Sequence, residues 1–226
     1  MRRRDRPRPQ AFLTPAGLFY CVPQRLPARP RSLRGLGALF EYGKQLVDRK
    51  RREPGDDVIT RLCATEGVSD DEAAMLSMAL LFAGHETAVV QIGLAVAHLL
   101  ARPDQWQALV DDPDLMPAAV EELLRVPGQG GGGIPRYART DLDIAGVTVH
   151  AGDLVLLDIG AANHDPAAYP DPDALDIARG TTRHLAFGHG SRYCIGAPLA
   201  RIELQTTLEL LTARFPTLRL AVPPAG

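Results

Sequence analysis

Hydrophobic positions follow a helical period over most of the chain. Between residues 36 and 53, apolar side chains recur at a spacing of three to four and the segment ends in charges before Pro54-Gly55, which predicts a helix and its stop; the apolar positions are Leu36, Leu39, Phe40, Leu46 and Val47. A second, shorter helix is predicted around Val58–Leu62. Ser69 then precedes three acidic residues, an N-cap followed by charges that suit the positive end of a helix.

A long helix is predicted next, from about residue 70 to residue 101, with Pro103 ending it. The stretch Ala73–Gly84 is uncharged, but His85-Glu86 interrupts the apolar run, which is too short to span a membrane. The pattern therefore favours a buried core helix. Two shorter helices are predicted at about residues 104–110 and 117–126.

A glycine-rich run, Gly128–Gly133, separates this helical part from short segments that read as strands. Four strands are predicted, at residues 134–140, 141–144, 147–150 and 154–159, with Ala145-Gly146 as a hairpin turn. An irregular stretch rich in Pro and Asp follows at 163–179, then a helix at 197–214 and a last strand at 217–222. The order of the elements predicts a mainly α fold with a small β portion.

The first 34 residues differ from the rest in charge and in proline content. They hold nine arginines and one aspartate, a net charge of +8, so the remainder carries −10 of the total of −2. Dense prolines remove backbone donors and break helices, so residues 1–35 are expected to be a flexible tail or sequence foreign to the folded part at 36–226. A secretion signal is the alternative, because Met1–Arg8 is basic and Ala11–Val22 is apolar. Pro15 interrupts that apolar stretch, however, and no small-x-small cleavage site follows it.

Composition narrows the class of protein. A chain of 226 residues that is 46% hydrophobic can form one substantial domain or two small ones. The charged fraction of 23% and the mean hydropathy of −0.06 exclude a disordered chain and a membrane-embedded one. Three scattered cysteines, Cys21, Cys63 and Cys194, fit neither a disulfide framework nor a zinc knuckle. Arginine supplies 23 of the 25 basic residues, which indicates a genome-composition bias and weakens a nucleic-acid role for the basic start.

A cysteine in a glycine-rich loop is the most informative motif. The loop reads Phe187-Gly188-His189-Gly190-Ser191-Arg192-Tyr193-Cys194-Ile195-Gly196. Glycines let a backbone pass close to a flat ligand and point amides at an anion, while the start of the following helix favours a thiolate at Cys194. Arg192 can hold a carboxylate. The alternative is a buried structural cysteine in a tight turn.

Ala83-Gly84-His85-Glu86-Thr87 is the second motif, inside the long predicted helix. An acid and a hydroxyl in mid-helix are costly if they face a core without a function. Gly84 leaves a gap where a ligand could lie against the helix, and Thr87 can donate to the carbonyl four residues back and open the helix locally. A zinc-protease motif is excluded because its second histidine position is Val89. A solvent-facing polar stripe on an amphipathic helix is the alternative.

Glu122-Leu123-Leu124-Arg125 is the third motif. Glu122 and Arg125 share one helix face and can pair, although most such pairs are surface ion pairs that contribute little. The run Gly128–Gly133 lacks the Gly-Lys-Ser/Thr end of a phosphate-binding loop, which argues against a nucleotide site.

In this order and spacing, the three motifs resemble those of the cytochrome P450 family of haem-thiolate monooxygenases, in its soluble bacterial branch. Pro135-Arg136-Tyr137-Ala138, 162–166 and 196–201 are similar to that branch as well, so the likeness covers about residues 36–220. The resemblance implies the C-terminal part of the cytochrome P450 fold, with a long central helix, short β hairpins and a haem-binding loop.

The resemblance also implies haem b as the cofactor, with Cys194 as the thiolate ligand of its iron. Thiolate donation favours O–O cleavage in such sites. Phe187 matches the aromatic residue near the sulfur, and Arg192 and Arg136 match the partners of the haem propionates. Gly188 and Gly190 match the positions that let the loop reach the haem, and Gly196 closes the motif.

On the distal side, Glu86 and Thr87 match an acid–alcohol pair that relays protons, and Ala83 and Gly84 match the lining of the oxygen-binding groove. Glu122 and Arg125 match a pair that locks the core behind the haem, a structural role. The family often completes this lock with an Arg or His from the irregular stretch. Here the corresponding place is Ala174, which leaves Arg179 as the nearest cation.

The function implied is a monooxygenase that inserts one atom of O2 into an organic, apolar substrate. Electrons would come from a ferredoxin or flavoprotein and ultimately from NAD(P)H, in the cytoplasm, with neither nucleic acid nor membrane as a partner. Complete members have roughly 400 residues, so the chain resembles only the C-terminal half. One alternative is therefore a truncated, inactive fragment with weak or no haem binding. A haem-sensing module is a third hypothesis, against which the intact Glu86-Thr87 pair argues.

Overall fold

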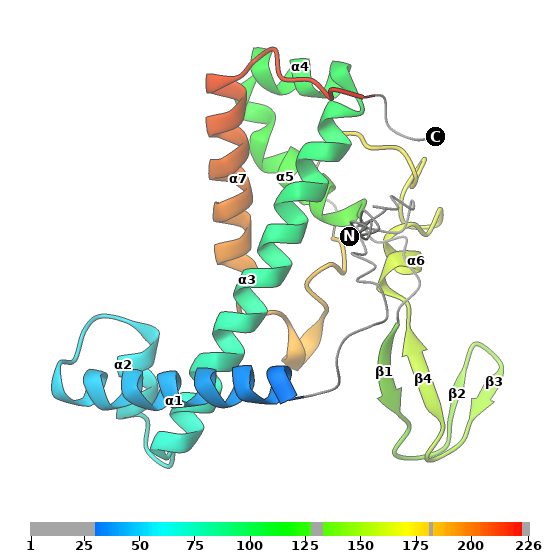
Figure 1. Ribbon diagram of the computed structural model, residues 1–226. Coiled ribbons are helices and arrows are strands. Elements are labelled where there is room, and N and C mark those ends of the chain that lie inside the picture. Colours follow the sequence, from blue (N-terminus) through cyan, green and yellow to red (C-terminus); the bar gives the residue numbers. More distant parts are fainter. Residues whose placement is uncertain (1–29, 128–132, 181–182, 223–226) are drawn as a thin grey trace, which may run out of the picture. The chain divides into compact units, whose positions relative to one another are not determined.

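A computed structural model describes residues 30–127, 133–180 and 183–222, and it confirms a mostly helical chain with small sheets (Figure 1). The chain divides into two compact units, whose boundary falls after Thr87 within the long helix α3 (Asp70–Leu100). The first unit takes its described part from residues 30–87 and the second from residues 88–222.

The first unit consists of α1 (Pro30–Arg52), α2 (Val58–Ala64) and the beginning of α3. Asp57 caps α2 by accepting a hydrogen bond from the Thr60 amide at 2.9 Å. At the start of α3, the Glu72 amide donates to Ser69 Oγ and the Ser69 amide donates back to the Glu72 carboxylate. This capping box satisfies two backbone donors that a helix start leaves free and confirms the predicted N-cap.

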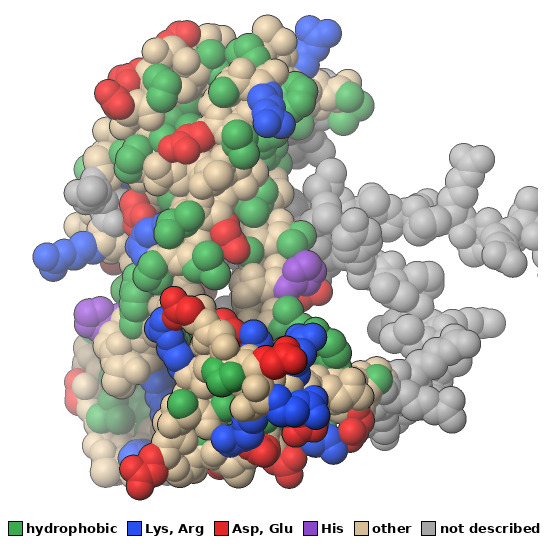
Figure 2. Space-filling model, turned by 90° about the vertical axis from the view of Figure 1, so that its left-hand side faces the viewer, with side chains coloured by type: hydrophobic (Ala, Val, Ile, Leu, Met, Phe, Trp, Pro, Cys, Tyr) green, Lys and Arg blue, Asp and Glu red, His purple; other side chains and the backbone are tan. Residues whose placement is uncertain are grey.

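A small core holds the first unit together, formed by the buried residues Val47, Cys63, Ala73 and Ala74. α1 comes close to α3 at Gly43, where an added Cβ would lie 3.1 Å from the Ala74 carbonyl oxygen. Figure 2 shows basic and acidic side chains intermixed over α1 and α2, and the ion pairs there include Lys50–Asp57 and Arg51–Asp70. The exposed Arg51–Asp70 pair adds little to stability.

The beginning of α1 corrects one sequence-based boundary. Residues 1–35 were expected to be a flexible tail or sequence foreign to the folded part, with the first helix beginning at Leu36, yet the helix starts at Pro30. Proline is tolerated in the first turn of a helix, because the amide it lacks would have no intrahelical partner there. The expectation for residues 1–29 lies outside the described residues.

The second unit packs the end of α3 with α4 (Pro103–Asp111), α5 (Met116–Arg125) and α7 (Ala197–Arg214), and a short 3-10 turn, η1 (Pro113–Leu115), joins α4 to α5. Their core includes the fully buried side chains Leu99, Leu109, Leu123, Leu204 and Leu208. Trp106 is 3% exposed and donates its indole N–H to the Pro216 carbonyl at 2.9 Å. This bond fastens the chain after α7 to α4.

Two antiparallel ladders lie side by side in the second unit (Figure 1). β1 (Ile134–Tyr137) pairs with β4 (Leu154–Leu157), and β2 (Leu142–Ile144) pairs with β3 (Val147–Val149). Ala145 and Gly146 turn the second pair with φ of 51° and 82°. Two consecutive positive φ angles mark the hairpin turn that matches strand twist, as Ala145-Gly146 was expected to supply.

Two sequence predictions in this unit are wrong. The strand predicted to Ile159 ends at Leu157, because Asp158 caps a short helix, α6 (Ile159–Asn163), by accepting from the Ala161 amide at 2.9 Å. The strand predicted at 217–222 does not form, since the described chain there has no partner strand and turns instead, with the Leu218 amide donating to Phe215.

Among the described residues, α3 alone is long and apolar enough to cross a membrane, judged by length and composition. The prediction of a buried core helix is wrong for most of its length, since 17% of its apolar window is buried. Its buried apolar residues lie towards its two ends, at Ala73, Ala74, Ala95 and Leu99, where neighbouring helices pack against it.

Candidate functional site

The cysteine loop folds tightly around its glycines. Gly188 and Gly190 both have φ of +73°, a conformation that favours glycine. The Gly188 amide donates to the Leu185 carbonyl at 2.8 Å, and the Cys194 amide donates to the Phe187 carbonyl at 3.0 Å. Between these bonds lies a single 3-10 turn, η2 (Gly190–Arg192). The loop therefore returns on itself and places Cys194 directly before α7.

Cys194 is an exposed free cysteine, so the alternative of a buried structural cysteine is wrong. Its neighbour Ile195 is 86% exposed. The sulfur lies three residues before α7, and an added Cβ at Gly196 would lie 3.8 Å from it. In the described part of the chain, no three side chains of His, Cys, Asp or Glu gather as a metal cluster.

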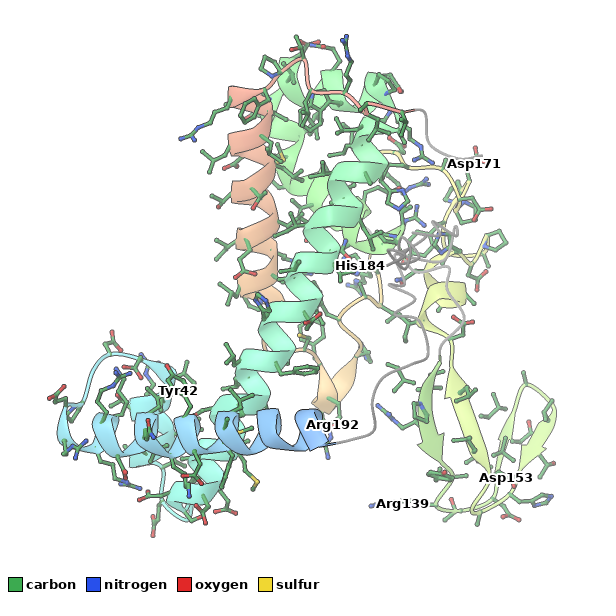
Figure 3. The ribbon with its side chains drawn as sticks, in the orientation of Figure 1. Tyr42, Arg139, Asp153, Asp171, His184 and Arg192 are labelled. Atoms are coloured by element: carbon green, nitrogen blue, oxygen red, sulfur yellow. The ribbon has the colours of Figure 1, made fainter. Side chains whose placement is uncertain are left out.

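Both candidate propionate partners are exposed arginines. Arg192 belongs to η2, and Figure 3 shows its side chain directed away from α5 and α7. Arg136 lies on β1 and donates to the Pro135 carbonyl of its own strand at 2.9 Å. Each guanidinium is thus available at the surface of the second unit.

Glu122 and Arg125 form a buried pair on α5, with side chains 1% and 0% exposed. Two parallel bonds of 2.8 Å join the guanidinium to the carboxylate. Arg125 also donates to the carbonyls of Asn163 and Pro172, and stacks on the ring of Tyr169. The alternative of a surface ion pair is wrong. The pair instead ties α5 to the irregular segment.

Arg179 completes this arrangement. Its Nε–H donates to Glu122 Oε1 at 3.1 Å, and its other nitrogens donate to carbonyls that include those of Asp171 and Ala174. Burial alone would raise the pKa of Glu122, but the hydrogen bonds from Arg125, the Asp176 amide and Arg179 outweigh it and lower the pKa. Ala174, the expected position of the third member, contributes its carbonyl oxygen.

The motif on α3 lies in the first unit. Ala83, Gly84, Glu86 and Thr87 are all exposed, and an added Cβ at Gly84 would meet nothing within 4 Å. Thr87 donates its hydroxyl to the Ala83 carbonyl at 2.6 Å, the bond expected of a threonine in mid-helix.

Exposure along this part of α3 is not confined to polar side chains. Leu81, Phe82 and Val89 are 55%, 70% and 58% exposed. An amphipathic helix with a solvent-facing polar stripe would bury such residues. Because apolar side chains are exposed beside the polar ones, the described surface of α3 is not such a stripe.

A second, half-buried electrostatic cluster was not predicted from the sequence. Glu121, the neighbour of Glu122, accepts two bonds from Arg201 of α7 and lies 3.1 Å from His184. Burial raises the pKa of Glu121, yet the bonds from His184 and Arg201 prevail and lower it to about 2. Sequence spacing could not join positions that are 63 and 80 residues apart.

Comparison with known proteins identifies the family to which the chain belongs. The model of the family described as Cytochrome P450 matches residues 38–220. The curated relatives include a nocardicin C N-oxygenase of Nocardia uniformis subsp. tsuyamanensis, 47% identical over 191 residues, and a mycinamicin IV hydroxylase/epoxidase of Micromonospora griseorubida, 45% identical over 189 residues. These alignments cover 83% and 81% of the chain, and 48% of each relative.

Solved structures agree with this. The mixed-function P450 MycG superposes with a TM-score of 0.82 at 41% identity, over 88% of this chain and 52% of MycG. The LnmA cytochrome P450 hydroxylase from the leinamycin biosynthetic pathway of Streptomyces atroolivaceus superposes equally well, at 42% identity. The chain spans about half the length of the relatives it matches.

Proposed function

Because the chain belongs to the cytochrome P450 family, we propose that it carries the haem-binding and proton-handling part of a bacterial monooxygenase. The reaction inserts one atom of O2 into an organic, apolar substrate. Electrons reach it from NAD(P)H through a ferredoxin or flavoprotein. The observation that carries this proposal is the exposed free thiol of Cys194, held before a helix in a loop with two left-handed glycines.

The donor set of this loop fits a haem. A thiolate is the form of cysteine that binds metal, and the beginning of α7 favours it over the thiol. Gly190 leaves room above the backbone, since an added Cβ there would meet nothing within 4 Å, and at Gly188 it would meet only the Arg192 carbonyl oxygen, at 3.9 Å. A thiolate-ligated haem supplies O–O cleavage when bound.

Each remaining residue has a distinct task in the proposal. Cys194 holds the iron and Phe187 packs beside the sulfur, while Arg192 and Arg136 bind the propionates with guanidinium groups suited to carboxylates. Gly196 allows the chain to turn from the loop into α7. Glu122 and Arg125 keep α5 attached to the irregular segment.

On α3, Ala83 and Gly84 leave space beside the helix for dioxygen, and Glu86 and Thr87 handle protons. The Thr87 hydroxyl donates to the Ala83 carbonyl, so its oxygen lone pairs remain free to accept a hydrogen bond from water. The Glu86 carboxylate, exposed one residue away, exchanges protons with solvent. The need for a reduced Cys194 favours the cytoplasm.

The competing hypothesis is a fragment that binds haem weakly or not at all. It is motivated by the exposed apolar side chains of α3, Leu81, Phe82 and Val89, since a large exposed apolar surface promotes aggregation. One measurement of haem binding, described next, separates the two hypotheses.

The chain is produced with a supply of haem, reduced, and treated with carbon monoxide. A red-shifted Soret band characteristic of a thiolate ligand supports the proposal, and Cys194→Ser should abolish it. Cys63→Ala, which removes a thiol in the core of the first unit, should leave the band in place. A soluble chain that takes up no haem, or an insoluble product, would support the fragment instead.

A further inference from the structure

Four side chains form a cluster at the beginning of the cysteine loop, and we call them the Arg201 clamp: Glu121 of α5, His184, Phe187 and Arg201 of α7. Arg201 Nε lies 2.6 Å from Glu121 Oε1 and its Nη2 lies 2.9 Å from Oε2, so the guanidinium meets the carboxylate through two parallel bonds. This two-pronged geometry fixes the plane of the guanidinium as well as its position.

The plane matters because its face rests on Phe187. The guanidinium carbon lies 4.7 Å from the centre of the Phe187 ring, within the range of a cation–π contact. Phe187 in turn packs against the core of the second unit, and its carbonyl accepts the bond from the Cys194 amide. A chain of contacts therefore runs from Glu121 through Arg201 and Phe187 to the backbone of Cys194.

His184 closes the cluster on the other side. Its Nδ1 accepts a bond from the Ala186 amide at 3.2 Å, so the ring proton sits on Nε2, which donates to Glu121 Oε2 at 3.1 Å. The imidazole is 2% exposed and lies 5.9 Å from the Phe187 ring, centre to centre. Glu121 thus accepts hydrogen bonds from both Arg201 and His184. The Phe187 ring is contacted by the rings of His184 and Tyr193 and by the Arg201 guanidinium.

We propose that Glu121 and Arg201 are positioning residues, which hold Phe187 and thereby fix the shape of the loop that presents the Cys194 sulfur. The inference rests on the proposed function of Cys194 for its purpose, but the contacts it invokes exist in the chain without a cofactor. Arg201 acts through its flat face, so lysine, which can pair with Glu121 but cannot stack in the same way, should not replace it.

The test measures amide hydrogen exchange in the haem-free chain, resolved to the loop by fragmentation and mass spectrometry. In Arg201→Lys, exchange at the Cys194 and Gly188 amides should accelerate about tenfold, the scale of one lost cation–π contact. Exchange at the Val126 amide, bonded to Glu122 in the same unit, should not change. The matched control is Arg51→Lys, which alters an Arg–Asp pair of the first unit.

Phe187→Leu provides a second variant that keeps an apolar side chain but removes the aromatic face. It should accelerate the same two amides. The effect of the double variant with Arg201→Lys should fall well short of the product of the two single effects, because both changes remove the Arg201–Phe187 contact. Arg201→Lys also removes the bond to the Tyr193 hydroxyl. Unchanged loop exchange in Arg201→Lys would overturn the proposal. So would acceleration spread over the whole unit, or effects that multiply in the double variant.

Haem loading supplies an independent spectroscopic readout. If the wild-type chain binds haem, its reduced carbon monoxide complex should contain a larger fraction without the thiolate band in Arg201→Lys than in Arg51→Lys. If the wild-type chain takes up no haem, the proposed function fails, while the exchange measurement still decides whether the clamp holds the loop.

Discussion

Arg179 donates its Nε–H to Glu122 Oε1 at 3.1 Å, although the two residues are 57 positions apart. The bond brings a third member to the buried pair of Glu122 and Arg125 and attaches the irregular segment to α5. Arg125 already donates two bonds to the same carboxylate, so the single buried charge of Glu122 is paired with two guanidinium groups.

Glu122→Ala should therefore lower the free energy of unfolding by about 3–5 kcal/mol, since it leaves a buried guanidinium without its counter-charge. Urea denaturation followed by circular dichroism measures the loss. The exposed Glu66→Ala is the control, with an expected change of less than about 0.5 kcal/mol. A Glu122→Ala protein as stable as the wild type would show that the carbonyls around Arg125 suffice to hold it.

The lowered pKa of Glu121 predicts that the free energy of unfolding depends on pH. Its pKa is lowered from 4.5 to about 2, so its contribution to stability is fully present above pH 4.5 and is lost as the pH falls toward about 2. Glu121→Gln removes the charge and should flatten the fall of the unfolding free energy across that window. An equally steep dependence in wild type and variant would mean that other carboxylates carry the acid sensitivity.

Gly188→Ala and Gly190→Ala should each impair haem uptake. Both glycines have φ of +73°, and a side chain in that conformation costs about 1 kcal/mol or more. Gly67→Ala is a matched control, because Gly67 has φ of +78° in the first unit, away from the cysteine loop. It should show the same strain in unfolding but an unaltered Soret band. Normal haem binding by both loop variants would exclude a need for the left-handed turns.

Thiol labelling distinguishes the cysteines. Cys194 is exposed whereas Cys63 is buried, so a maleimide should modify Cys194 at least about tenfold faster in the native chain. Peptide mapping separates both sites from Cys21. Haem added beforehand should protect Cys194 and leave the slow reaction at Cys63 unchanged, and protection of both or neither would contradict iron ligation by Cys194.

Sequence patterns located most helices well, because helical periodicity and capping are local. α7 has the predicted bounds, from Ala197 to Arg214, and Pro198 marks its first turn. α6 was missed because five residues are too few to display a helical period. The strand expected at 217–222 needed a partner strand, which local alternation cannot supply.

In the candidate site, too, local motifs could be predicted and contacts between distant residues could not. The motif of Cys194 is contiguous, so its glycines and cysteine could be recognised from the sequence alone. The link from Glu122 to Arg179 and the bonds from Glu121 to His184 and Arg201 depend on how distant segments fold together. Glu121 had one signal, its place beside Glu122 on a helix, but nothing local indicated that its side chain would find two donors.

The fluorescence of Trp106 can report on the second unit separately from the first. It is the chain's single tryptophan, and it joins α4 to the segment after α7 through its bond to Pro216. Its fluorescence should change when the second unit loosens and stay silent when the first unit opens. Emission and circular dichroism followed together would then show whether the two units melt in one transition or in two, with no label attached.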